Sequence, residues 1–188
     1  MISHKYKCIF VHIPKTAGTS IENVLRDENP PVYNSLHNTA STYIKKYERY
    51  FDNYFKFSVV RNPWDRLVSG YFYHRALGYG SHKDRYGKSF KEFVQKIETF
   101  PQRHFLVGQY NYINIKGVDV LDYLIKFESL EEGFCEVSKK LNFKIKTLYD
   151  VRKTEHKHYT EYYNDETKQI VAEKYAKDIE YFGYEFGE

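Results

Sequence analysis

The sequence has little of what marks a secreted or membrane protein. It contains two cysteines in 188 residues, too few for a disulfide framework. One of them, Cys8, lies in an apolar run that predicts a buried strand, so a reducing compartment is expected. No apolar run approaches the roughly eighteen residues of a membrane span, and the first residues lack the apolar core of a signal peptide. We therefore expect a cytoplasmic protein without a membrane span.

The excess of positive charge is also small. There are 29 Lys and Arg residues against 25 Asp and Glu residues, which gives a formal net charge of +4. This excess suits an anionic ligand, but it is too weak and too dispersed to indicate a nucleic-acid partner. The length favours a single domain over residues 1–188, large enough to bury a proper core. The sequence leaves the oligomeric state open.

Two features of the ATP-binding P-loop are missing. In G-x-x-x-x-G-K-[ST] the lysine follows the second glycine, whereas here Lys15 precedes Gly18 and no glycine opens the loop. The second apolar strand ends at Arg61, where P-loop enzymes place an aspartate that holds magnesium. These differences predict an anion site that works without a metal.

That anion site is predicted at the first strand–turn–helix unit of the chain. The run Cys8–Val11 predicts a buried strand, Pro14–Gly18 cannot continue it, and an amphipathic helix begins at about Thr19. The unpaired N–H groups of a first helical turn and the helix dipole favour negative charge. Lys15 adds a full positive charge, so this unit predicts a phosphate site.

A second unit of the same kind follows. Residues 55–60 predict a strand, Arg61 leaves its end, and a helix is expected from Trp64 to about Leu77 with Ser69 facing back. The guanidinium of Arg61 suits a phosphate group. Ligands bind at the carboxyl ends of parallel strands, so both units are expected at one rim. Two anion sites there predict a nucleoside with a phosphate at each end.

The remaining pattern alternates strands and helices, which predicts an α/β fold with a parallel sheet. A third strand is expected at residues 123–127, and the glycine-rich residues 78–87 predict a surface loop and candidate lid. Further helices are predicted at residues 41–51, 89–97, 130–141 and 165–181.

The segments IPKTAGTS (residues 13–20) and VVRNPWDRLVSGY (residues 59–71) resemble the two binding motifs of the sulfotransferases that use 3′-phosphoadenylyl sulfate (PAPS). The resemblance is to the carbohydrate O-sulfotransferase branch, of the heparan 2-O and chondroitin/dermatan type. It extends loosely to LIKFESL (residues 124–130) and to the tyrosine-rich tail. It implies a P-loop-like three-layer sandwich, with a central mostly parallel sheet flanked by helices, in a compact microbial or viral relative.

The resemblance also implies a role for each motif residue. The 5′-phosphosulfate of PAPS would be bound by Lys15, Thr16, Ala17, Gly18, Thr19 and Ser20. Lys15 would contact the bridging oxygen, where charge develops as the S–O bond breaks. Arg61 and Ser69 would hold the 3′-phosphate, and Arg152 and Lys153 would add phosphate contacts. The sulfuryl group would pass in line to an acceptor hydroxyl, expected on a carbohydrate, leaving 3′,5′-ADP and needing no metal.

The general base is expected between the two motifs, and His37 lies in the matching interval. His12 and Glu22 are the competing candidates, although His12 is better placed to support the loop. Two other functions remain open: a non-catalytic nucleotide- or glycan-binding relative, and a P-loop nucleotide kinase. The sequence does not define the acceptor.

Overall fold

The computed structural model describes residues 1–26, 37–76, 86–100, 104–144, 148 and 156–188. They fall into two compact units, which are described separately. The first unit comprises Met1–Val60 and Gln109–Arg152, and the second comprises Arg61–Gly108 and Lys153–Glu188. That the whole chain acts as one domain stays a prediction.

A four-stranded sheet forms the centre of the first unit. Its order is β1-β2-β3-β6, built from β1 (Ile2–Ser3), β2 (Cys8–Val11), β3 (Phe55–Val60) and β6 (Tyr123–Lys126). β2, β3 and β6 run parallel, with Phe10 opposite Phe57 and Phe57 opposite Tyr123. The predicted strands and the mostly parallel sheet are therefore confirmed. The antiparallel strand β1 was not predicted, because two residues carry no readable pattern.

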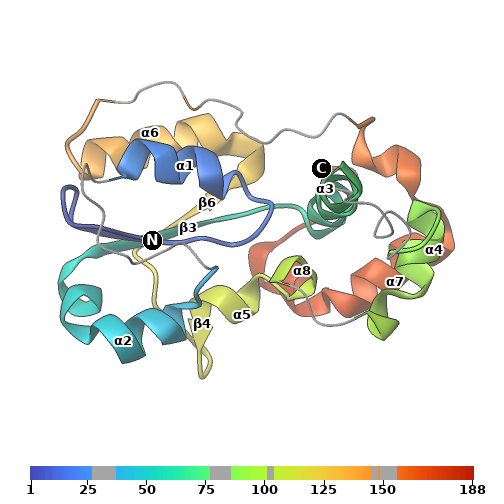
Figure 1. Cartoon of the computed structure of the whole chain (residues 1–188), viewed down its shortest axis with the longest axis horizontal. Coiled ribbons are helices and arrows are strands. Elements are labelled where there is room, and N and C mark those ends of the chain that lie inside the picture. The colour runs from blue at the N-terminus through green and yellow to red at the C-terminus, as the bar shows by residue number, and fades with distance from the viewer. Residues whose placement is uncertain (27–36, 77–85, 101–103, 145–147, 149–155) are drawn as a thin grey trace. The chain divides into compact units, whose positions relative to one another are not determined.

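Helices cover both faces of this sheet, as Figure 1 shows. On one face, α1 (Gly18–Leu25) and α6 (Leu130–Lys140) pack over Phe10, Phe57 and Ile125 in a shared buried cluster. α2 (Ala40–Asn53) lies on the other face. α6 approaches β6 closely because it carries Gly133, where an added Cβ would lie 2.5 Å from Cγ2 of Ile125. The first unit is thus a helix–sheet–helix arrangement, as the predicted fold class requires.

The segment between Gly108 and β6 contains short elements that the sequence pattern did not resolve. α5 (Tyr110–Ile113) is followed by a two-stranded hairpin of β4 (Asn114–Ile115) and β5 (Val118–Asp119). Its turn uses left-handed backbone at Lys116 (φ 52°) and Gly117 (φ 90°). The 3₁₀ turn η4 (Phe127–Ser129) then joins β6 to α6.

The second unit is helical and aromatic. It contains α3 (Pro63–Ala76), α4 (Phe90–Gln95), α7 (Asp165–Lys174) and α8 (Ala176–Phe182), with the 3₁₀ turns η2 (Ile97–Thr99), η3 (His104–Leu106) and η5 (Tyr159–Tyr162). Its core is rich in rings: Phe93, for example, stacks on Tyr71 with centroids 5.2 Å apart. Aromatic side chains supply the burial that aliphatic residues provide in most cores.

The prediction of one helix over residues 165–181 was wrong. The chain breaks at Tyr175 (φ −111°, ψ 24°), which separates α7 from α8. The Tyr175 ring is buried, and its hydroxyl donates to the carbonyl oxygen of Leu106 at 3.2 Å. A buried hydroxyl needs a partner, and this long-range contact is invisible to a periodicity argument.

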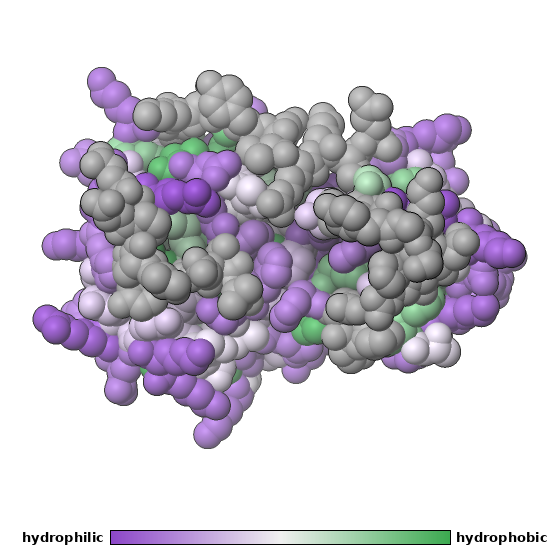
Figure 2. Space-filling model, in the orientation of Figure 1, coloured by the Kyte–Doolittle hydropathy of each residue, from purple (hydrophilic) through white to green (hydrophobic). Residues whose placement is uncertain are grey.

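Among the described residues, no helix is long and apolar enough to cross a membrane. In the face shown in Figure 2, most of the side chains that are not grey are hydrophilic, and hydrophobic ones appear only in small separate patches.

Candidate functional site

The turn between β2 and α1 has a defined and partly strained backbone. Lys15 (φ 69°) and Ala17 (φ 62°) both adopt the left-handed conformation, which non-glycine residues seldom use. Thr16 lies between them, fully buried, and its hydroxyl donates to the carbonyl oxygen of Ile13 at 2.9 Å. The turn is therefore fixed by its own hydrogen bond, and strain of this kind is concentrated at functional sites.

The start of α1 contains no acidic residue of its own. Its N-cap residue, Ala17, makes no side-chain capping hydrogen bond, and the first turn contains no acidic residue. The other described helices of eight or more residues differ: α2 and α7 are capped by Thr39 and Asn164, and α3 and α6 have acidic residues in their first turns. The dipole at the start of α1 therefore favours an anion, although the amide of Ser20 already donates to the carbonyl oxygen of Ala17 at 3.0 Å.

The three residues that the sequence offered as general bases lie together. His12 Nδ1 is 2.9 Å from Glu22 Oε1, and both side chains are 9% exposed. His37 Nδ1 is 3.3 Å from the carbonyl oxygen of His12, and the two imidazole rings meet edge to face with centroids 4.5 Å apart. The structure therefore places His37 beside the strand end that leads into the turn.

His12 also packs against the first residue of α1. A Cβ added to Gly18 would lie 2.0 Å from Cδ2 and 2.1 Å from Nε2 of His12. Both distances are far below van der Waals contact, so a side chain at position 18 would displace the ring. The glycine of the motif is thus required by packing against His12, which agrees with the expectation that His12 supports the loop.

The second motif has its own anchoring contacts. Arg61 Nε donates to Asp65 Oδ2 at 2.7 Å, with side-chain exposures of 11% and 18%. Asn62 is buried; its amide nitrogen donates to the carbonyl oxygen of Glu185 at 2.8 Å, and its oxygen accepts from the Trp64 amide at 3.1 Å. None of these contacts was predicted from the sequence, although the spacing of Arg61 and Asp65 is a recognisable ion-pair signal.

Comparison with known proteins now gives the family. The sequence profile described as "Sulfotransferase family" matches residues 1–185. The chain belongs to the sulfotransferase family. It is 32% identical over 94 residues to an uncharacterised protein of Archaeoglobus fulgidus, covering 50% of this chain and 72% of that relative. No solved structure matches. Membership assigns the transfer of sulfuryl groups as the general class of reaction.

Not every predicted residue of this sulfotransferase can be placed. Arg152, Lys153 and nearly all of the candidate lid at residues 78–87 lie outside the described residues. Ser69 is described, in α3, where it is 5% exposed. Lys15 to Ser20 lie in the first unit, and Arg61 and Ser69 lie in the second.

Two buried tyrosines are poor candidates for the base. Burial raises the pKa of Tyr43, and the negative charge of Glu22 raises it further. Burial likewise raises the pKa of Tyr163 well above its ordinary value, and the Tyr163 hydroxyl donates to the carbonyl oxygen of Trp64 at 2.9 Å. Both therefore remain neutral phenols at neutral pH; the Tyr43 hydroxyl accepts a hydrogen bond from the N-terminal amine of Met1, and neither serves as a base.

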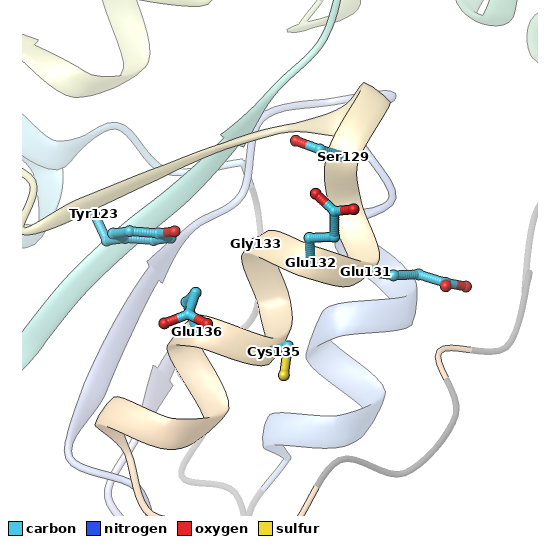
Figure 3. Close-up of a pocket in the computed structure, with 7 residues that line it drawn as sticks. All are labelled: Tyr123, Ser129, Glu131, Glu132, Gly133, Cys135 and Glu136. Carbon is cyan, nitrogen blue, oxygen red and sulfur yellow. The ribbon is translucent and has the colours of Figure 1, made fainter.

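The sulfotransferase also has a pocket on α6, shown in Figure 3, with a volume of about 670 Å³. Three of its lining residues are glutamates, Glu131, Glu132 and Glu136. Their charge would repel a phosphorylated nucleotide, so the pocket does not suit the donor. Among the described residues, no group of three or more His, Cys, Asp or Glu side chains is placed to hold a metal ion.

Proposed function

We propose that this sulfotransferase moves a sulfuryl group from PAPS to an acceptor hydroxyl on a carbohydrate. The observation that carries the proposal is the start of α1, which has neither a capping side chain nor an acidic residue in its first turn and begins three residues after Lys15. A doubly charged phosphosulfate supplies the negative charge that this helix start lacks. The carbohydrate acceptor rests on the resemblance of residues 13–20 and 59–71 to the carbohydrate branch.

The same resemblance assigns the two ends of the donor to different motifs. Lys15 and residues 16–20 bind the 5′-phosphosulfate, and Arg61 and Ser69 bind the 3′-phosphate. Arg152 and Lys153 add contacts to the phosphates. When bound, PAPS supplies an activated sulfuryl group whose departure leaves 3′,5′-ADP. Lys15 stabilises the charge that develops on the leaving oxygen, so the reaction proceeds without a metal.

His37 is the proposed base. Its Nδ1 lies 3.3 Å from the backbone oxygen of His12, which can only accept a hydrogen bond. In the neutral imidazole Nδ1 then carries the proton, and Nε2 keeps a lone pair. Nε2 takes the proton of the acceptor hydroxyl as the oxygen attacks sulfur and the bond from sulfur to the leaving oxygen breaks.

The proposal is tested by Lys15→Ala, with Lys45→Ala on the exposed surface of α2 as the matched control. Removing one group that stabilises a developing charge should lower the rate of sulfate transfer by about 10²–10³. The measurement is transfer of labelled sulfate from PAPS to a panel of carbohydrates, alongside calorimetric binding of 3′,5′-ADP. Binding of ATP that requires magnesium, with no binding of 3′,5′-ADP, would instead identify a nucleotide kinase.

The base is tested by His37→Ala, with His104→Ala at an exposed position as the control. We expect kcat to fall by roughly 10²–10⁴ while the affinity for 3′,5′-ADP is retained. An unchanged kcat would exclude His37 as the base. A wild-type protein that binds 3′,5′-ADP but transfers sulfate to no acceptor would favour the non-catalytic binding relative.

A further inference from the structure

We infer that Glu22 and His12 form a positioning pair, which sets both the backbone of the donor-binding turn at Gly18 and the orientation of His37. The inference concerning His37 rests on the proposed function, because it takes His37 as the base. It assigns Glu22 no contact with the substrate, although a carboxylate at this place is a candidate base from the sequence alone.

His12 and Glu22 share one proton between their side chains. An ionised carboxylate only accepts hydrogen bonds, so at 2.9 Å His12 Nδ1 carries the proton and donates it to Glu22 Oε1. With both side chains 9% exposed, water competes little for this bond. Glu22 belongs to α1, and His12 directly follows the last residue of β2. Their hydrogen bond therefore connects the helix to the strand across the turn.

The His12 ring packs between Phe10 and Gly18. On one side it stacks on Phe10, with centroids 5.7 Å apart and planes at 20°. Its Cδ2–Nε2 edge lies against Gly18, leaving no space for a Cβ. The ring is thus fixed between the sheet and the first residue of α1. If the ring rotates, the amide groups of the turn lose their support.

His37 lies against residue 12. Residue 12 contacts His37 twice, through its backbone oxygen at Nδ1 and through its ring at 4.5 Å between centroids. His37 itself has left-handed backbone (φ 43°), a conformation that needs support from its surroundings. The contact with the backbone oxygen selects the tautomer with a lone pair on Nε2. Residue 12 therefore sets where the base lies and which nitrogen acts.

Two substitutions at Glu22 separate positioning from catalysis. Glu22→Gln keeps an oxygen that accepts from His12 Nδ1, so we expect kcat within about fivefold of wild type. Glu22→Ala removes the acceptor, and displacement of His37 should lower kcat by up to about 10²-fold. Glu48→Gln, exposed on α2, is the matched control. If Glu22 were the base, Glu22→Gln would lose about 10²–10⁴ in kcat, and the inference would fail.

A double-mutant cycle tests the contact without any activity. Gly18→Ala should lower the melting temperature strongly, because its Cβ collides with His12. In the His12→Ala background the same change should cost much less, since the ring is gone. Effects on the melting temperature that simply add would overturn the contact. This readout holds even if the protein proves to bind no 3′,5′-ADP and to transfer no sulfate, which would defeat the proposed function alone.

The tautomers can be read by NMR of the imidazole nitrogens, with His12 and His37 assigned by substitution. We expect the proton of each neutral ring on Nδ1, and a shift of the His37 signals in Glu22→Ala but not in Glu48→Gln. Unmoved His37 signals in Glu22→Ala would overturn the link between the pair and the base.

Discussion

Two helices of this protein begin just after neighbouring parallel strands, and they differ in whether their first turn contains an acidic residue. α1 follows β2 and starts with no capping side chain and no acidic residue. α3 follows β3 and starts with Asp65, which binds Arg61 at 2.7 Å. The first turn of α1 contains no acid, whereas Asp65 offsets part of the positive potential at the start of α3. The same strand–turn–helix pattern therefore leaves the first turn of α1 without an acid and gives the first turn of α3 one, which is why α1 is the proposed phosphosulfate site.

The largest expected effect comes from giving α1 the acid that α3 has. Thr19→Asp places a carboxylate in the first turn of α1, at the proposed site of the phosphosulfate. We expect the affinity for 3′,5′-ADP to fall about a hundredfold or more, because like charges a few ångströms apart repel strongly. Stability should nevertheless rise by about 0.3–1 kcal/mol, since the acid favours the helix start.

Calorimetry with 3′,5′-ADP and thermal unfolding check these two opposite signs, and Thr19→Asn is the uncharged control. A loss of both binding and stability would mean that Thr19 is required for folding. The weaker binding could then not be attributed to the added charge at the start of α1.

A smaller effect is expected from removing the acid of α3. Asp65→Asn keeps an oxygen for Arg61 Nε but removes the charge, so the affinity for 3′,5′-ADP should rise by about two- to tenfold. α3 should lose about 0.3–1 kcal/mol of stability, because its dipole loses a favourable charge. Titration of 3′,5′-ADP at low and high salt checks the change, with Arg61→Ala as the variant expected to weaken binding. Unchanged affinity in both variants would remove Arg61 from the phosphate site.

The smallest effect concerns the strained backbone of the turn. Ala17 adopts φ 62°, so Ala17→Gly should raise the free energy of unfolding by roughly 0.5–1 kcal/mol as the strain is relieved. In the regular helix α7, Ala172→Gly should lower it by about the same amount. Urea unfolding of the two variants checks this difference in sign. A loss of stability in both would show that the turn stores no strain.

Local patterns predicted the framework well. Both β2 and β3 match their expected ranges, because short apolar runs bounded by turn residues have few alternatives. The break at Tyr175 was missed, since α7 and α8 share one continuous helical pattern and the break depends on a contact with Leu106. The sequence indicated that Lys15 and Gly18 belong to an anion site. It did not indicate that the ring of His12 occupies the space where a Cβ of residue 18 would lie.

The sequence by itself determined where the turn lies, that a helix follows it and that Lys15 lies within it. These features depend only on neighbours within a few residues. The tertiary structure decided the rest of the candidate site. Residues 12, 22 and 37 are distant along the chain, and they meet only because strand, helix and the following segment pack at one place. From the sequence, His37 was the preferred base and Glu22 and His12 were its competitors; the contacts among the three residues support the separate roles proposed above.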